Sequence, residues 1–304
     1  MKINLFYRGI FYTCLASLFW GIPQPLIFNE IKFIPAIEIV SHRGVWSFIF
    51  LLLITVTFNK IDDFLIIFKS YKKILILSLT AILISVNWTG FILAVSFNRV
   101  QDASMGYFIT PMISIALGYF FLKENISILK LISIVMMFFA IIYLIISMKT
   151  FPFIALLIGT TWGIYGFLRK QVNVSAEVGL LYESALISLI ALPYLIYLYN
   201  QDSGFFLNHS PNTSSYLILA GLVTIFPLFF FNLGVKHIPL GLAGVLFYLA
   251  PSFHFITSVF ILNENLSLHK LFSFLIIWLA VAIFIIDIYK KEVKFNENNT
   301  QLLN

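Results

Sequence analysis

The stretch Ser17-Leu18-Phe19-Trp20-Gly21-Ile22-Pro23-Gln24-Pro25 lies inside the first long apolar segment of the chain. Each of its prolines removes a backbone N–H and clashes one turn back, so a helix loosens there. In lipid, backbone groups freed in this way are tolerated only against protein or water-filled space. The tripeptide Trp-Gly-Ile returns at Trp162-Gly163-Ile164, again within an apolar segment. Helices interrupted at matching places in two halves are typical of a solute-binding site within a membrane.

The composition is that of an integral membrane protein with little outside the bilayer. Of the 304 residues, 61% are hydrophobic and 11% are charged, whereas a soluble protein has about 25% charged residues. The net charge of +6 does not predict a nucleic-acid partner, because the basic residues lie at the ends of apolar segments and fit membrane topology. The single cysteine, Cys14, excludes a disulfide framework or a cysteine-based metal site.

The spacing of apolar residues predicts an all-α membrane protein with ten transmembrane helices, since a span needs about 20 mostly apolar residues. The predicted ranges are 8–28, 36–57, 74–96, 102–121, 127–147, 152–168, 178–199, 214–233, 240–262 and 268–288. Lys and Arg, with Arg169 and Lys170 among them, gather at the segment ends that face one side. By the positive-inside rule, this bias places both termini in the cytoplasm. We expect the chain to lie in the inner membrane of a bacterium.

The two halves of the chain repeat each other. Pro111–Ser133 aligns with Pro251–Ser273, and the identities include the proline, a Glu-Asn-x-Ser motif and a lysine. Shared apolar composition does not explain these polar matches. We therefore predict two five-helix repeats, residues 1–148 and 149–289, followed by a cytoplasmic tail, 290–304. An odd number of spans in each repeat inverts the second relative to the first, which is the basis of alternating access.

Charged residues within the spans have two interpretations each. Arg43, next to His42, could form a cationic wall of a cavity, or it could reach an interface or pair with Glu38. Glu183 occupies the position in the second repeat that matches His42, so the two could face each other. A buried carboxyl group can exchange protons because burial disfavours its charged form. Glu183 and His42 could thus serve proton coupling. Alternatively, Glu183 could bind an amine group of the substrate or make a structural hydrogen bond.

Other motifs have simpler interpretations. The small residues of Gly159-Thr-Thr-Trp-Gly163 predict close helix packing. Ser127 and its repeat mate Ser267 are predicted helix N-caps. The sequence lacks a phosphate-binding Gly-x-x-x-x-Gly-Lys-Ser/Thr loop and the His-Glu-x-x-His and Gly-x-Ser-x-Gly motifs, so we expect no enzyme activity, cofactor or metal.

Several runs resemble the RarD branch of the EamA transporters, within the drug/metabolite transporter superfamily. They are Phe19-Trp20-Gly21-Ile22, His42-Arg43-x-x-Trp46, Asn87-Trp88, Gly106-Tyr107-Phe108-Ile109-x-Pro111 and Glu183, and the resemblance extends over essentially the whole chain. It implies a central cavity from helices 1–4 and 6–9, with helices 5 and 10 at the periphery, and transport of amino acids or similar metabolites. This chain has Phe247 before Tyr248 where the family pattern has glutamine, so the resemblance does not extend to the substrate.

We expect a secondary transporter that moves a small organic solute by alternating access. The best class of solute is an amino-acid-like or related amphipathic metabolite, and the choice between import and export is left open. The alternative is a non-transporting membrane receptor or assembly protein with structural polar residues. The expected partners are the solute and membrane lipids, without nucleic acid, and the oligomeric state is left open. The predicted cavity residues are Trp20, His42, Arg43, Asn87, Trp88, Tyr107, Trp162, Tyr165, Glu183, Phe247 and Tyr248. Any one of them could instead belong to an interfacial belt or to helix packing.

Overall fold

The computed structural model describes residues 2–96, 100–148, 153–262 and 268–301, and every regular element in these ranges is helical. The helices are α1 Lys2–Gly21, α2 Pro23–Glu30, α3 Ala36–Thr57, α4 Ile61–Ile67, α5 Tyr71–Ser96, α6 Val100–Leu122, α7 Ile128–Met148, α8 Phe153–Gln171, α9 Ala176–Asn200, α10 Pro211–Val235, α11 Leu240–Phe247, α12 Leu249–Ile256 and α13 Leu268–Gln301. A π-helical turn, Thr257–Ile261, continues α12.

Eight helical segments within the described ranges are long and apolar enough to cross a membrane. They belong to α1–α2, α3, α5, α7, α9, α10, α11–α12 and α13, and α6 adds a shorter apolar stretch, Gly106–Leu122. Large apolar side chains such as Phe120, 72% exposed, face outward, as expected of a surface that meets lipid. The chain is thus an all-helical multi-pass membrane protein, and the count of ten spans stays a prediction.

The predicted interruption of the first span is present, because α1 ends at Gly21 and α2 begins at Pro23. Pro25 has no N–H to bond the carbonyl of Gly21, which instead accepts a hydrogen bond from Thr257 Oγ1 at 2.9 Å. His254 Nε2 lies 2.7 Å from the carbonyl oxygen of Trp20. Side chains from α12 and the π-helical turn therefore satisfy the backbone at this break.

The second predicted interruption, at Trp162-Gly163, is wrong. Helix α8 runs unbroken from Phe153 to Gln171, because it contains no proline and every interior N–H can bond one turn back. The second half is instead interrupted at Tyr248, between α11 and α12. Pro251, in the first turn of α12, cannot donate to the carbonyl of Phe247.

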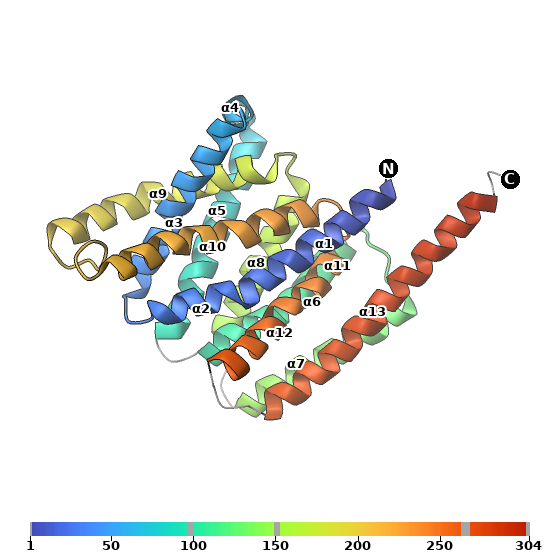
Figure 1. Cartoon of the computed structure of the whole chain (residues 1–304). Helices are drawn as coiled ribbons and strands as arrows, with labels where there is room; N and C mark the ends of the chain where they lie inside the picture. The colour runs from blue at the N-terminus through green and yellow to red at the C-terminus, as the bar shows by residue number, and fades with distance from the viewer. Residues whose placement is uncertain (1, 97–99, 149–152, 263–267, 302–304) are drawn as a thin grey trace.

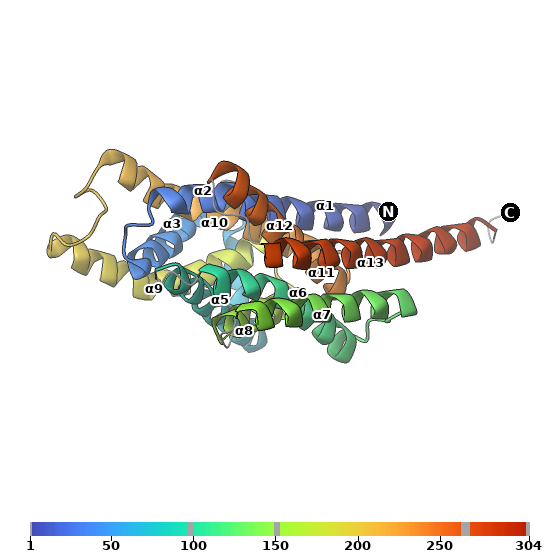
Figure 2. The ribbon, with the colours of Figure 1, turned by 90° about the horizontal axis from the view of Figure 1, so that it is seen from below.

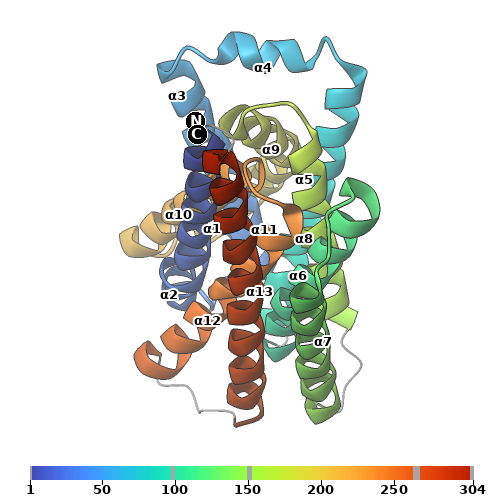
Figure 3. The ribbon, with the colours of Figure 1, turned by 90° about the vertical axis from the view of Figure 1, so that its right-hand side faces the viewer.

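The first residues of α1, helix α4 and the last residues of α13 lie at one end of the bundle, which we call the proximal end (top of Figure 3). The opposite end, which holds α2, is the distal end. The link between α3 and α5, which lies between the predicted spans 36–57 and 74–96, contains the short helix α4. Helix α13 continues to Gln301 where a tail was predicted from residue 290, since residues 290–301 contain neither glycine nor proline.

Helix contacts divide the molecule into a packed bundle and an outer pair. Helices α7 and α13 lie side by side along one edge and pack mainly on each other (Figures 1 and 2). Inside the bundle, α6 crosses α8 closely at Gly106 and Gly159. A methyl group on Gly159 would stand 2.9 Å from Ile109 Cβ and 3.0 Å from the Gly106 carbonyl oxygen. The small-residue pattern therefore serves packing, as predicted.

Candidate functional site

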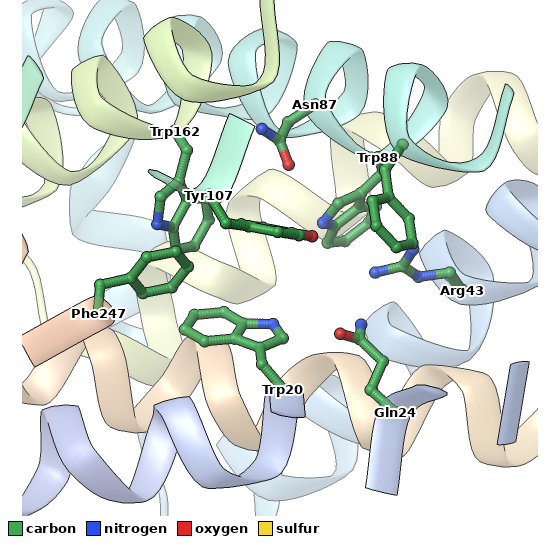
Figure 4. A pocket seen from close by; sticks show the side chains of 9 residues that line it. Trp20, Gln24, Arg43, Asn87, Trp88, Tyr107, Trp162 and Phe247 are labelled. Carbon is green, nitrogen blue, oxygen red and sulfur yellow. The ribbon is translucent and has the colours of Figure 1, made fainter. Parts of the chain in front are cut away.

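A narrow central cavity lies where the α1–α2 break meets the end of α11. Its volume is about 20 Å³, which is room for one or two water molecules. Seven helices supply its wall, and α5 supplies three of the side chains (Figure 4). The lining residues are Trp20, Gln24, Arg43, Asn87, Trp88, Phe91, Tyr107, Trp162 and Phe247.

One side of the central cavity is an aromatic wall. The indoles of Trp20 and Trp162 meet edge to face with centroids 5.0 Å apart, and Phe247 lies 5.4 Å from Trp20. Tyr107 stands 5.8 Å from Phe247 on the other flank. The two copies of the Trp-Gly-Ile tripeptide thus come together at one site from opposite halves of the chain, although only the first copy interrupts its helix.

The other side of the central cavity carries a cation. Arg43 is 2% exposed, and its Nε donates to Thr224 Oγ1 at 3.0 Å. Its guanidinium lies over the rings of Trp88 and Phe28, at 4.6 and 4.9 Å from their centroids. The two terminal nitrogens point into the cavity (Figure 4) and donate to no side chain in the described ranges. The predicted alternative, a pair with Glu38, is wrong, because Glu38 Oε1 accepts the N–H of Phe205 at 2.7 Å.

Two amides complete the polar side. Asn87 donates through Nδ2 to the carbonyl of Ile158 at 2.9 Å and to Thr161 at 3.0 Å, which leaves Oδ1 toward the cavity (Figure 4). Gln24, 5% exposed, points its amide toward the same space. The cavity therefore offers a cation and both hydrogen-bond donors and acceptors opposite an apolar wall, an arrangement that suits a small amphipathic molecule.

Seven predicted residues line the central cavity: Trp20, Arg43, Asn87, Trp88, Tyr107, Trp162 and Phe247. Two lining residues were not predicted, Gln24 and Phe91. Both could have been predicted from the sequence. Gln24 stands between two prolines, and Phe91 follows Asn87 by one helical turn, on the same face.

The other four predicted residues lie outside the lining. Tyr248 donates its hydroxyl to the carbonyl of Phe108 at 2.9 Å. His42 packs on Phe206, with ring centroids 5.0 Å apart, and its Nε2 is 4.0 Å from Glu38. Tyr165 and Glu183 belong to a separate buried cluster. His42 and Glu183, predicted to face each other, thus have different partners.

This buried polar cluster joins α5, α8, α9 and α10. Arg169, predicted only as a charge at a helix end, is fully buried, with Nη1 3.6 Å from Glu183 Oε1. Its Nε donates to Asn232 Oδ1 at 2.8 Å. Glu183 also accepts hydrogen bonds from Thr80 at 2.6 Å and from the hydroxyl of Tyr165 at 3.2 Å. The cluster satisfies one buried ion pair with several hydrogen bonds, which is the geometry such a pair needs.

Further polar contacts connect the helices to one another at the proximal end. Glu124 accepts the backbone N–H groups of Leu240 at 2.5 Å and Gly241 at 3.0 Å, and so caps α11. Lys170 donates to the carbonyl of Val235 at 2.8 Å. Lys236 donates to the carbonyl of Val174, and burial, with the charge of Arg169 as a second cause, lowers the pKa of Lys236 to about 8. These bonds hold the proximal parts of α6, α8, α10 and α11 together.

Of the two predicted N-caps, Ser127 is confirmed by a hydrogen bond of 3.3 Å from the N–H of Lys130 to its Oγ. Its mate Ser267 lies outside the described residues.

Comparison with known proteins agrees with the fold. The model of the EamA-like transporter family matches residues 7–146 and 150–286. The uncharacterized transporter YojE of Bacillus subtilis is 34% identical over 281 residues, covering 91% of this chain and 93% of YojE. Protein RarD of Escherichia coli is 30% identical over 280 residues, covering 92% and 94%.

A solved crystal structure, described only as that of a protein, shares the fold. Its TM-score is 0.69 at 13% identity, and the match covers 92% of this chain and 96% of that one. Because the family model matches most of the chain, the protein is a RarD-like member of the EamA-like transporter family.

Proposed function

We propose that the protein is a secondary transporter that moves a small, amino-acid-like or related amphipathic metabolite across the bacterial inner membrane by alternating access. The observation that carries the proposal is the central cavity, which sets Arg43 and two amides opposite an aromatic wall. Both halves of the chain contribute to that wall, as a site between two moving repeats requires. No observation favours the receptor or assembly alternative, and the relatives named transporters fit a protein that is not an enzyme.

The packing of the helices supports ten spans arranged as two inverted repeats. In this arrangement the first repeat is α1–α2, α3, α5, α6 and α7, and the second is α8, α9, α10, α11–α12 and α13. Exchanging the repeats turns the most extensive contacts between them into one another: α1 packs on α10 as α8 packs on α5, and α6 packs on α8 as α11–α12 packs on α1. The mates α3 and α9, α6 and α11, and α7 and α13 contact each other. A pseudo-two-fold axis gives this pattern.

The small size of the central cavity supports a mechanism with moving parts. At about 20 Å³ the cavity cannot admit a metabolite without a rearrangement, because ligand sites usually measure about 300 Å³ or more. The proximal end is fastened by Glu124, Lys170 and the Arg169–Glu183 pair. Opening toward that end must therefore break these contacts. The first residues of α1 and the last residues of α13 lie at the same end of the bundle as α4, which has neighbouring lysines, and this supports a cytoplasmic proximal end.

Within this proposal, Glu183 is the group for proton coupling and His42 is a second candidate. Protonation of Glu183 would remove its attraction to Arg169 and loosen the cluster with Thr80 and Tyr165. His42 stands 4.0 Å from Glu38, which gives it a carboxylate neighbour when protonated.

The test is a flux screen in liposomes that contain the purified protein. A labelled panel of amino acids and nucleotides is supplied, and we expect at least one solute to cross faster than through empty liposomes. Phe247→Ala, in the wall of the cavity, should slow that flux, whereas the matched change Phe120→Ala on the lipid-facing surface should not. Leak rates alone across the panel would favour the receptor or assembly alternative.

A further inference from the structure

The one cation in the wall of the central cavity, Arg43, has no carboxylate partner among the described residues. The lining residues include no Asp or Glu, and no carboxylate in the described ranges lies within ion-pair distance of Arg43. The other buried arginine, Arg169, does have such a partner in Glu183. A buried charge without a partner is strongly unfavourable, so an anion that enters the cavity would relieve the cost.

The shape of the site selects the kind of anion. The guanidinium of Arg43 lies over Trp88 and Phe28, at 4.6 and 4.9 Å from the ring centroids. Its Nε already donates a hydrogen bond to Thr224. The edge that holds the two terminal nitrogens faces the cavity (Figure 4). Two parallel N–H groups on one edge match the two oxygens of a coplanar carboxylate.

We propose that the central cavity recognises its solute through a carboxylate group held by the edge of Arg43, so that anionic and zwitterionic solutes bind and their cationic or neutral analogues do not. The amide groups of Asn87 and Gln24 serve a polar substituent beside the carboxylate, and the aromatic wall of Trp20, Trp162 and Phe247 takes the apolar remainder. This inference rests on the proposed function.

The experiment compares matched solutes in the liposome assay. Each amino acid of the panel that crosses is supplied both as the acid and as its carboxamide. In the wild-type protein we expect the amide to cross at least about 30-fold more slowly, which corresponds to about 2 kcal/mol. Arg43→Gln should slow the acid by a similar factor and remove the preference, while Arg43→Lys should keep part of it. Lys32→Gln, which removes an exposed cation, is the control and should keep the full preference.

Equal rates for acid and amide in the wild-type protein, or an unchanged preference in Arg43→Gln, would overturn the inference and leave transport established. Absence of flux for the whole panel would count against the proposed function instead. In that case a second measurement, which needs no transported solute, tests whether the charge of Arg43 attracts anions to the cavity.

This second measurement uses the three tryptophans of the cavity wall, Trp20, Trp88 and Trp162, in a protein that also carries Trp46→Phe and Trp278→Phe. Iodide, an anion, should quench their fluorescence, and Arg43→Gln should reduce that quenching several-fold because the local positive potential is lost. Quenching by caesium, a cation, should not fall. Iodide quenching that Arg43→Gln leaves unchanged would overturn the inference.

Discussion

The two buried arginines should respond in opposite ways to the same substitution. In the described part of the chain, Arg169 contacts Glu183 and Asn232, whereas the side chain of Arg43 makes a single hydrogen bond, to Thr224, and has no carboxylate within ion-pair distance. We therefore compare Arg169→Met with Arg43→Met, since methionine keeps much of the apolar stem and removes the charge in both cases. The quantity compared is the free energy of unfolding of the protein without solute.

Arg169→Met leaves Glu183 buried without its counter-charge, and breaking a buried pair from one side costs about 3–5 kcal/mol. Arg43→Met loses one hydrogen bond, about 1 kcal/mol, and cation–π contacts of about 0.5–2 kcal/mol. It also removes an unpaired buried cation, whose desolvation costs several kcal/mol. We expect Arg169→Met to destabilise by at least about 3 kcal/mol and Arg43→Met to be neutral or stabilising.

The measurement is reversible unfolding in mixed detergent micelles, followed by tryptophan fluorescence at neutral pH. Adding Glu183→Gln to Arg169→Met removes the orphaned carboxylate, so the double variant should be more stable than Arg169→Met alone. If Arg169→Met unfolds like the wild type, or if Arg43→Met is the more destabilised of the two, the assignment of one arginine to structure and the other to solute binding is refuted.

Four further predictions follow from the described contacts. Glu183→Gln should abolish uptake driven by a pH gradient and preserve counterflow, and retained pH-driven uptake would remove Glu183 from proton coupling. Gly159→Leu should destabilise the protein by about 1–3 kcal/mol in the same unfolding assay, because even a methyl group there stands 2.9 Å from Ile109; wild-type stability would contradict the close packing of α6 on α8. In a Cys14→Ser background, cysteines at Tyr107 and Phe247 should react with aqueous reagents from one side of the membrane at a time, and solute should protect them; labelling that ignores solute would count against a binding cavity. Reporter tags on the two termini should both be found in the cytoplasm, and opposite locations would rule out ten spans.

Hydropathy and length were sufficient to predict where most of the long helices lie. The segment predicted over 36–57 is α3, Ala36–Thr57, and that over 178–199 is α9, Ala176–Asn200. Apolar composition is a property of each segment by itself, so it can be read without knowledge of the neighbours. Most of the cavity wall could also be predicted from single segments. A charged residue such as Arg43 is rare within an apolar segment, so it marks a position that faces the interior of the bundle.

The partners of these residues could not be read in the same way. Glu183 was matched with His42 by their positions in the repeats, yet it pairs with Arg169 from the neighbouring helix α8. The pairing depends on how α8 and α9 rotate about their axes, which packing with other helices decides. The repeated Trp-Gly-Ile tripeptide likewise identified the site but not the second break, because an interruption depends on nearby prolines and not on the tripeptide.

The unpartnered charge of Arg43 also determines how the membrane potential would act on the protein. Moving one elementary charge through 100 mV changes the free energy by about 2.3 kcal/mol. An empty cavity carries the positive charge of Arg43, whereas a cavity that holds a monovalent carboxylate is neutral. The voltage would then act on the return of the empty protein and leave the loaded crossing unaffected. Exchange of one monovalent anion for another would be independent of voltage, and net movement of such an anion would depend on it.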